Sequence, residues 1–101
     1  MDKQARIERI SLMENRFDGA TRVLGELDEA ISGYEHFKSE FEALKDYMAS
    51  GEWKEDYEAD EAGMVPADLK RGVLSQDGLY NLLQDADRII CRALDVLGKA
   101  L

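Results

Sequence analysis

The fold is decided by the stretch that separates two helical patterns, residues 51–78, which reads GEWKEDYEADEAGMVPADLKRGVLSQDG. It contains the only tryptophan and the only proline of the chain, a dense run of acidic residues and an Arg-Gly pair. Apolar residues recur at helical spacing on both sides of it, so the stretch interrupts one helical region and leads into another. A flexible linker would not need this mixture of residues. The stretch therefore predicts a structured connector over residues 51–74 in an all-α fold.

The second half of the connector is predicted to form a short helical turn that starts at Pro66, where a missing N–H group costs nothing. Leu69 would be the buried residue of this turn, and Gly72 would end it in a left-handed conformation. Residues 73–74 would then run extended into the next helix.

A heptad pattern runs through the first half of the chain, with steps that alternate between three and four residues. Two three-residue steps fall together at Tyr34, beside Gly33. This irregularity indicates either a stammer in one long helix or a break between two helices. The apolar or small residues of the pattern are Ile10, Met13, Phe17, Ala20, Leu24, Leu27, Ile31, Tyr34, Phe37, Phe41, Leu44 and Met48.

The two alternatives differ in what covers the apolar residues. One helix over residues 3–49 would be about 70 Å long at the helical rise per residue, and its seam would need a second chain. A break near Gly33 would instead allow a self-contained three-helix bundle. We favour the break, and in either case expect a homo-oligomer or binding to another protein.

The C-terminal helix is predicted over residues 75–98. Ser75 is a good N-cap, Asp77 complements the positive end of the helix dipole, and Gly98 is a stop signal. The apolar stripe of this helix is wider than a heptad seam, which favours contact with two neighbours. Cys91 lies within the stripe and is expected to be a buried small hydrophobe, without a base beside it that would make it a nucleophile.

Length and composition favour a single helical domain over residues 1–101. The N-terminus is charged and lacks the apolar region of a secretory signal, and no stretch approaches the roughly 20 apolar residues of a membrane span. A single cysteine fits a reducing compartment. These features predict a soluble cytoplasmic protein that does not bind membranes.

The net charge of −9 is concentrated in the middle of the chain, where residues 24–68 carry 14 of the 22 acidic side chains and 3 of the 13 basic ones. Direct binding to nucleic acid phosphates is therefore disfavoured, because it needs a basic face. A basic partner, a divalent cation or mimicry of nucleic acid remain as interpretations of the acidic surface, beside plain solubility.

The strongest candidates for metal binding are acidic residues spaced as at the start of a calcium loop, with Asp68 or Asp77 as further ligands. The match fails where the loop needs glycine, at Glu61, and where it needs glutamate, at Ala67. The alternative is that one or two of these acids pair with Lys70 or Arg71 and hold the connector in place. The candidates are Asp56, Glu58, Asp60 and Glu61.

Two aromatic residues of the connector, Trp53 and Tyr57, are four residues apart, so one helical turn places both rings on the same face. They could anchor a ligand or partner, but closing the core is the favoured role. His36 is the only histidine and is expected to be a partly exposed helix residue rather than a zinc ligand.

No catalytic constellation and no cofactor-binding motif is recognisable. The sequence thus predicts a non-enzymatic helical interaction module that presents the acidic connector. The alternative is a divalent-metal-binding protein or metal-dependent enzyme built on the four acids.

The connector also resembles a small bacterial family of uncharacterised proteins that is classed as a domain of unknown function. Gln76 departs from the glutamate expected in that family, which weakens any cation-binding role at this position. The resemblance implies the fold class and transfers no activity. It rests on the pairs Arg9-Ile10 and Met13-Glu14 and on Glu52, Trp53, Asp56, Tyr57, Glu58, Asp60, Glu61, Ala62, Gly63, Pro66, residues 68–75 and Asp77; its structural motif residues are Trp53, Tyr57, Pro66, Leu69, Arg71, Gly72, Ser75 and Asp77.

Overall fold

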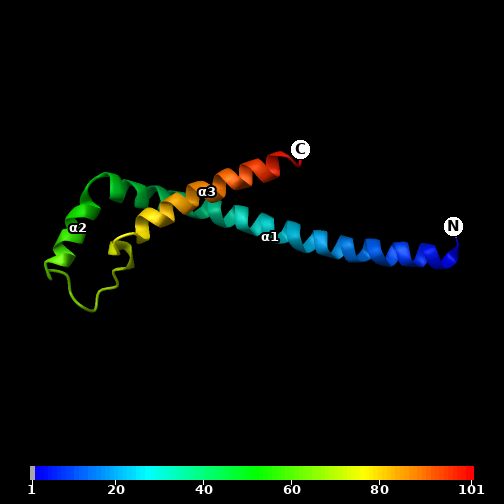
Figure 1. The fold of residues 1–101 in the computed structure, drawn as a ribbon, viewed down its shortest axis with the longest axis horizontal. Coiled ribbons are helices and arrows are strands. Elements are labelled where there is room, and N and C mark those ends of the chain that lie inside the picture. The colour runs from blue at the N-terminus through cyan, green and yellow to red at the C-terminus, as the bar shows by residue number, and fades with distance from the viewer. Residues whose placement is uncertain (1) are drawn as a thin grey trace. The chain divides into compact units, whose positions relative to one another are not determined.

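The computed structural model describes residues 2–101, which form three α-helices and one 3-10 turn (Figure 1). Helix α1 spans Lys3–Ala49, α2 spans Glu52–Glu61, the 3-10 turn η1 spans Gly72–Leu74, and α3 spans Gly78–Gly98. The described residues contain no strand. The predicted all-α fold, with a long N-terminal helix, a connector and a C-terminal helix, is therefore confirmed.

The break that we favoured near Gly33 is not formed, because α1 runs without interruption from Lys3 to Ala49. The start of the helix is capped by Asp2, whose carboxylate accepts a hydrogen bond of 2.7 Å from the backbone N–H of Ala5. A helical glycine costs about 1 kcal/mol relative to alanine, and no proline accompanies Gly33. The good helix formers around Gly33 therefore keep the helix continuous. The irregular spacing of the apolar residues is a stammer within this helix.

The chain divides into two compact units, residues 1–38 and residues 39–101. The described part of the first unit is the N-terminal portion of α1, on which the large apolar side chains are exposed except Leu27, which is half-buried. The second unit contains the last turns of α1 together with α2, η1 and α3. Its core lies where η1 meets the start of α3, at Leu74 and Leu79, which are 8% and 3% exposed.

Two glycines in the left-handed region shape the chain around α2. Gly51, with φ of 87°, makes the turn from α1 into α2. Gly63, with φ of 74°, ends α2, and the N–H of Met64 reaches back to the carbonyl of Ala59 at 2.9 Å. This 6→1 hydrogen bond satisfies a carbonyl at the helix end as in a Schellman motif. Both positions favour glycine because side chains strain this backbone conformation.

The second half of the connector differs from its prediction. The chain turns at Pro66, whose carbonyl accepts a hydrogen bond of 3.1 Å from the N–H of Leu69, but no helix starts there. Leu69 is 55% exposed instead of buried. Gly72 has no left-handed backbone and begins η1, so Val73 and Leu74 are helical rather than extended. The apolar residue that the connector buries is Leu74.

The predicted start of the C-terminal helix was wrong by three residues. Helix α3 begins at Gly78, after Asp77, and the hydroxyl of Ser75 donates to the carbonyl of Gly72 at 2.9 Å instead of capping α3. A side chain at Gly78 would collide with Ser75 Oγ and approach the Gly72 carbonyl oxygen to 3.2 Å. The close approach of η1 to α3 therefore favours glycine at this position. The predicted end of α3 at Gly98 is confirmed.

Helix α3 has a half-buried side and an exposed side. Lys45 Nζ lies 3.7 Å from Asp87 Oδ1, which places the last turns of α1 beside α3. Cys91 is exposed, so the prediction that it is buried is wrong: the apolar stripe of α3 extends beyond the residues that are half-buried in the second unit. No helix among residues 2–101 is long and apolar enough to cross a membrane. The half-buried side includes Leu83, Ala86, Ile90 and Ala93, and the exposed side includes Leu82, Ile89, Leu94 and Val96.

Candidate functional site

Trp53 ties α2 to η1. Its indole N–H donates a hydrogen bond of 2.8 Å to the carbonyl of Val73, and its ring stacks on Tyr57 with centroids 5.1 Å apart and planes 16° from parallel. Helical spacing puts both rings on one face of α2, as the sequence predicted. Both side chains are half-buried. Because the polar edge of the indole is already satisfied within the chain, this pair serves to close the connector.

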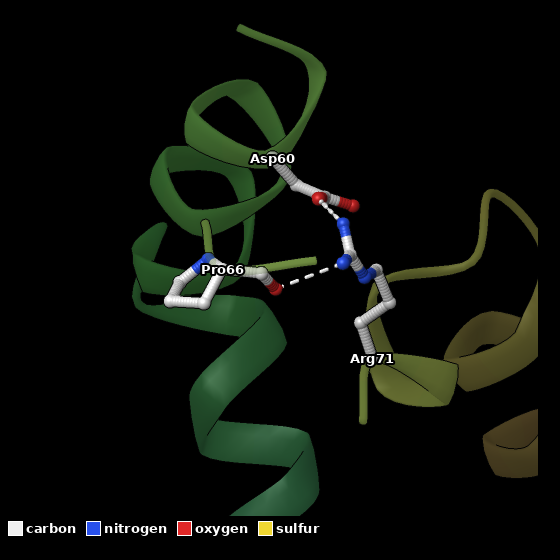
Figure 2. A network of polar contacts seen from close by, with 3 residues as sticks. All are labelled: Asp60, Pro66 and Arg71. Carbon is white, nitrogen blue, oxygen red and sulfur yellow. Dashed lines mark hydrogen bonds and ion pairs between the residues drawn. The ribbon is translucent and has the colours of Figure 1, made fainter. Parts of the chain in front are cut away.

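Arg71 links α2 to the turn at Pro66 (Figure 2). One guanidinium nitrogen, Nη1, pairs with Asp60 Oδ1 of α2, and the other, Nη2, donates to the carbonyl of Pro66 at 2.9 Å. The Asp60 side chain is only 14% exposed. The planar fork of arginine is suited to reach two acceptors at once, which a lysine ammonium cannot do in the same geometry. The expected pairing of a connector acid with Arg71 is present.

Asp56 accepts a hydrogen bond of 2.5 Å from the hydroxyl of Tyr47, in the last turns of α1. The pKa of Tyr47 is raised to about 12, first by burial, then by this hydrogen bond and by the negative charges of Asp56 and Glu52. The neutral hydroxyl is therefore the stable form and remains a donor. Sequence reasoning missed Tyr47, although its spacing of nine residues from Asp56 across the Gly51 turn was a usable signal.

The four metal candidates do not converge. Asp56 and Asp60 lie one helical turn apart on α2 and are held by Tyr47 and Arg71, whereas Glu58 and Glu61 are exposed. Alternate residues point to opposite sides of a helix, so the spacing that suits a calcium loop disperses the ligands here. Within residues 2–101, no group of three or more His, Cys, Asp or Glu is placed to hold a metal ion. The geometry supports the ion-pair interpretation of the acids.

A row of glutamates on α2 was not singled out from the sequence. Its members recur every third residue, and all four side chains are exposed. Like charges at this spacing destabilise an isolated helix, and only those in the first turn are favoured by the helix dipole. The row, called here the acidic row, drifts by about 60° around α2 at each step, so it gives the helix a negative surface that winds over roughly half of its circumference. It consists of Glu52, Glu55, Glu58 and Glu61.

The remaining motif residues have local roles. Asp77 supplies a backbone carbonyl that accepts the N–H of Asn81 at 2.9 Å in the first turn of α3. His36 is exposed on α1, as predicted, with Nδ1 2.8 Å from the carbonyl of Ser32. Gly72 and Ser75 shape η1 through their mutual hydrogen bond. None of these groups meets another reactive side chain in a hydrogen bond that would suggest nucleophilic catalysis.

A second candidate surface lies on the first unit, along the heptad pattern of α1. Five of its six large side chains are between 45% and 67% exposed, and the sixth, Leu27, is half-buried. The surface is hollowed between Leu24 and Ile31, where Gly25 has no side chain. We call this surface the α1 seam; it consists of Ile10, Met13, Phe17, Ala20, Leu24, Leu27 and Ile31.

The comparisons with known proteins agree with the family resemblance of the connector residues. A family model described as a domain of unknown function, DUF4298, matches residues 10–96. The comparisons with curated proteins and with solved structures found no match. The chain belongs to the DUF4298 family, and the resemblance carried by the connector residues is thereby confirmed.

Proposed function

We propose, for this member of the DUF4298 family, a role as a non-enzymatic protein–protein interaction module. The module associates through the α1 seam and presents the acidic row of α2 to a basic partner. The connector acts as the scaffold that fixes α2, since its own polar groups are used in contacts within the chain.

One observation carries the proposal: the α1 seam is exposed along a helix that makes no core of its own in the first unit. Phe17 and Leu24 are 67% and 65% exposed. In water most helical stability comes from packing of an amphipathic face rather than from intrinsic propensity. Contiguous apolar patches of this kind mark interaction surfaces. A partner that covers the seam would supply the packing that the helix lacks.

Light scattering after gel filtration, over a wide range of protein concentration, tests the association. We expect a mass above that of one chain, and Phe17→Gln with Leu24→Gln should shift the protein toward the monomer. Leu12→Gln is the matched control, because Leu12 is 47% exposed on the same helix but lies off the seam. A wild-type protein that stays monomeric at every concentration would remove the proposal.

The acidic row is tested with Glu55→Gln and Glu58→Gln in the full chain. These substitutions remove two charges without touching the contacts of Asp56 or Asp60. A partner recovered from the native host by the wild-type chain should bind the double variant more weakly and should be released by salt. Undiminished binding by a folded variant would exclude the acidic row as the contact surface.

A further inference from the structure

We propose that the α1 seam binds a second copy of this chain in a parallel, in-register coiled coil, with Arg9 of one copy beside Glu14 of the other. This inference rests on the proposed function and adds the identity and orientation of the partner.

The unbroken helix fixes the heptad positions of the seam. Isoleucine occupies two of the four a positions, and Leu27 occupies a d position, a combination that favours two strands in a parallel coiled coil. The seam keeps alternating steps of three and four over these residues, which is the spacing that lets two helices stay in contact while supercoiling. The a positions are Ile10, Phe17, Leu24 and Ile31, and the d positions within the seam are Met13, Ala20 and Leu27.

The residues on the two edges of the seam decide the orientation. In a parallel pair, the g residue of one heptad lies beside the e residue of the next heptad on the other helix. Arg9 then meets Glu14 of the second copy on both sides of the dimer, and Arg16 meets Thr21. No like charges face each other. The g positions are Arg9, Arg16, Val23 and Ala30, and the e positions are Glu14, Thr21, Asp28 and Glu35, of which Arg9 and Glu14 are exposed.

An antiparallel pair would place like charges together. Its e edges face each other, and three of the four e residues are acidic. Glu14 of one copy would then lie against Asp28 or Glu35 of the second copy, twice in each dimer. Like charges across an interface disfavour that arrangement, so the edge charges select the parallel orientation.

Charge reversal in the full-length chain tests the orientation. In a parallel dimer, Arg9→Glu sets two acids side by side and Glu14→Arg sets two basic groups side by side. Each variant should raise the dimer dissociation constant roughly tenfold. The double variant, and an equimolar mixture of the two single variants, should restore association because each contact is again between opposite charges. Circular dichroism checks that every variant keeps its helix.

The antiparallel alternative predicts the opposite sign for one variant. Glu14→Arg would replace an acid–acid contact by an acid–base contact and so tighten the dimer. A tightened dimer, or a dissociation constant that neither single variant changes, would overturn the parallel arrangement while leaving self-association in place. A chain that never self-associates would overturn the proposed function, and the orientation with it.

Disulfide trapping provides an independent readout of the register. The background carries Cys91→Ser, which removes the only native cysteine. In a thiol–disulfide buffer, Met13→Cys at a d position should form an intermolecular disulfide, because equivalent d residues face each other in an in-register parallel pair. Leu12→Cys, on the outer side of the helix, is the control and should remain reduced. Equal trapping of both variants, or of neither, would contradict the register.

Discussion

At the residue scale, Arg71 is the side chain on which most of the connector depends. It joins α2 and the Pro66 turn to the start of η1 through two acceptors, the carboxylate of Asp60 and the carbonyl of Pro66. Asp60, its charged partner, is largely withdrawn from water. A pair of this kind adds little net stability compared with apolar packing, but losing one partner leaves a carboxylate uncompensated. The pair therefore specifies the position of α2 more than it adds to the total stability.

Arg71→Ala should lower the free energy of unfolding by about 2 kcal/mol, because it leaves the Asp60 carboxylate and the Pro66 carbonyl without their donor. Arg71→Lys should cost about half as much, since an ammonium can keep only one of the two contacts. Urea denaturation measures both values. Lys70→Ala is the control: Lys70 is adjacent and exposed, and its removal should change the midpoint little. An equal loss of unfolding free energy in Lys70→Ala and Arg71→Ala would contradict the role given to the guanidinium group of Arg71.

Tyr47 gives a spectroscopic probe of the junction between α1 and α2. Its pKa is raised to about 12 by burial and by Asp56, so the folded chain holds the phenolic proton more tightly than the unfolded chain. The resulting stabilisation is complete below about pH 10 and is lost as the pH rises toward 12. Tyrosinate absorbance that disappears in Tyr47→Phe should report this ionisation.

Asp56→Ala should lower the pKa of Tyr47 by removing the hydrogen bond and one negative charge, while the part due to burial remains. Glu58→Ala is the control, because Glu58 does not contribute to the shift. A Tyr47 titration that does not respond to Asp56→Ala would show that Asp56 does not contribute to the raised pKa.

The sequence predicts some features of the site and not others. The stack of Trp53 on Tyr57 and the pairing of Arg71 with an acid follow from helical spacing and from the chemistry of the guanidinium group. The exposure of Leu69 and the preference for glycine at position 78 do not follow. The preference at position 78 depends on where η1 packs against α3, which is a tertiary contact that local sequence patterns do not encode.

At the element scale, α1 shows why glycine alone was a poor guide to helix ends. Gly19, Gly25 and Gly33 are all helical, and a side chain added at each would meet no neighbouring atom within 4 Å. Gly51 ends α1 because its φ is positive. The sequence alone does not distinguish Gly51 from the glycines that lie within the helix. The irregular spacing at Tyr34, where we favoured a break, lies within an unbroken helix. The consecutive three-residue steps there turn the apolar stripe by roughly 60° around the helix.

Gly33→Ala should stabilise α1 by about 0.5–1 kcal/mol, since it removes the entropic cost of glycine and meets open space. Gly51→Ala should have the opposite sign and cost about 1 kcal/mol, because alanine is strained at a φ of 87°. Thermal and urea unfolding, followed by far-UV circular dichroism, compare the two. A destabilised Gly33→Ala variant would mean that position 33 is not helical in solution.

At the scale of the whole molecule, the two units have different sources of stability. Residues 39–101 contain the buried leucines, the Trp53 hydrogen bond and the Arg71 pair. The described residues of the first unit form a helix that exposes the α1 seam and buries no residue of its own. The match to the family covers most of both, so the family's sequence pattern includes the self-contained connector and the helix that carries the seam.

Separation of the two units tests this division of roles. A chain of residues 39–101 should unfold cooperatively and remain monomeric, because it keeps the core and the connector contacts but lacks the α1 seam. A peptide of residues 2–38 should gain helicity with concentration, since a helix without packing is only marginally stable in water. Light scattering and circular dichroism measure the two behaviours. If residues 39–101 still associated, the contact would have to lie on the second unit. Helix α3 exposes Leu82, Ile89 and Val96 there, and these residues would be the first to test.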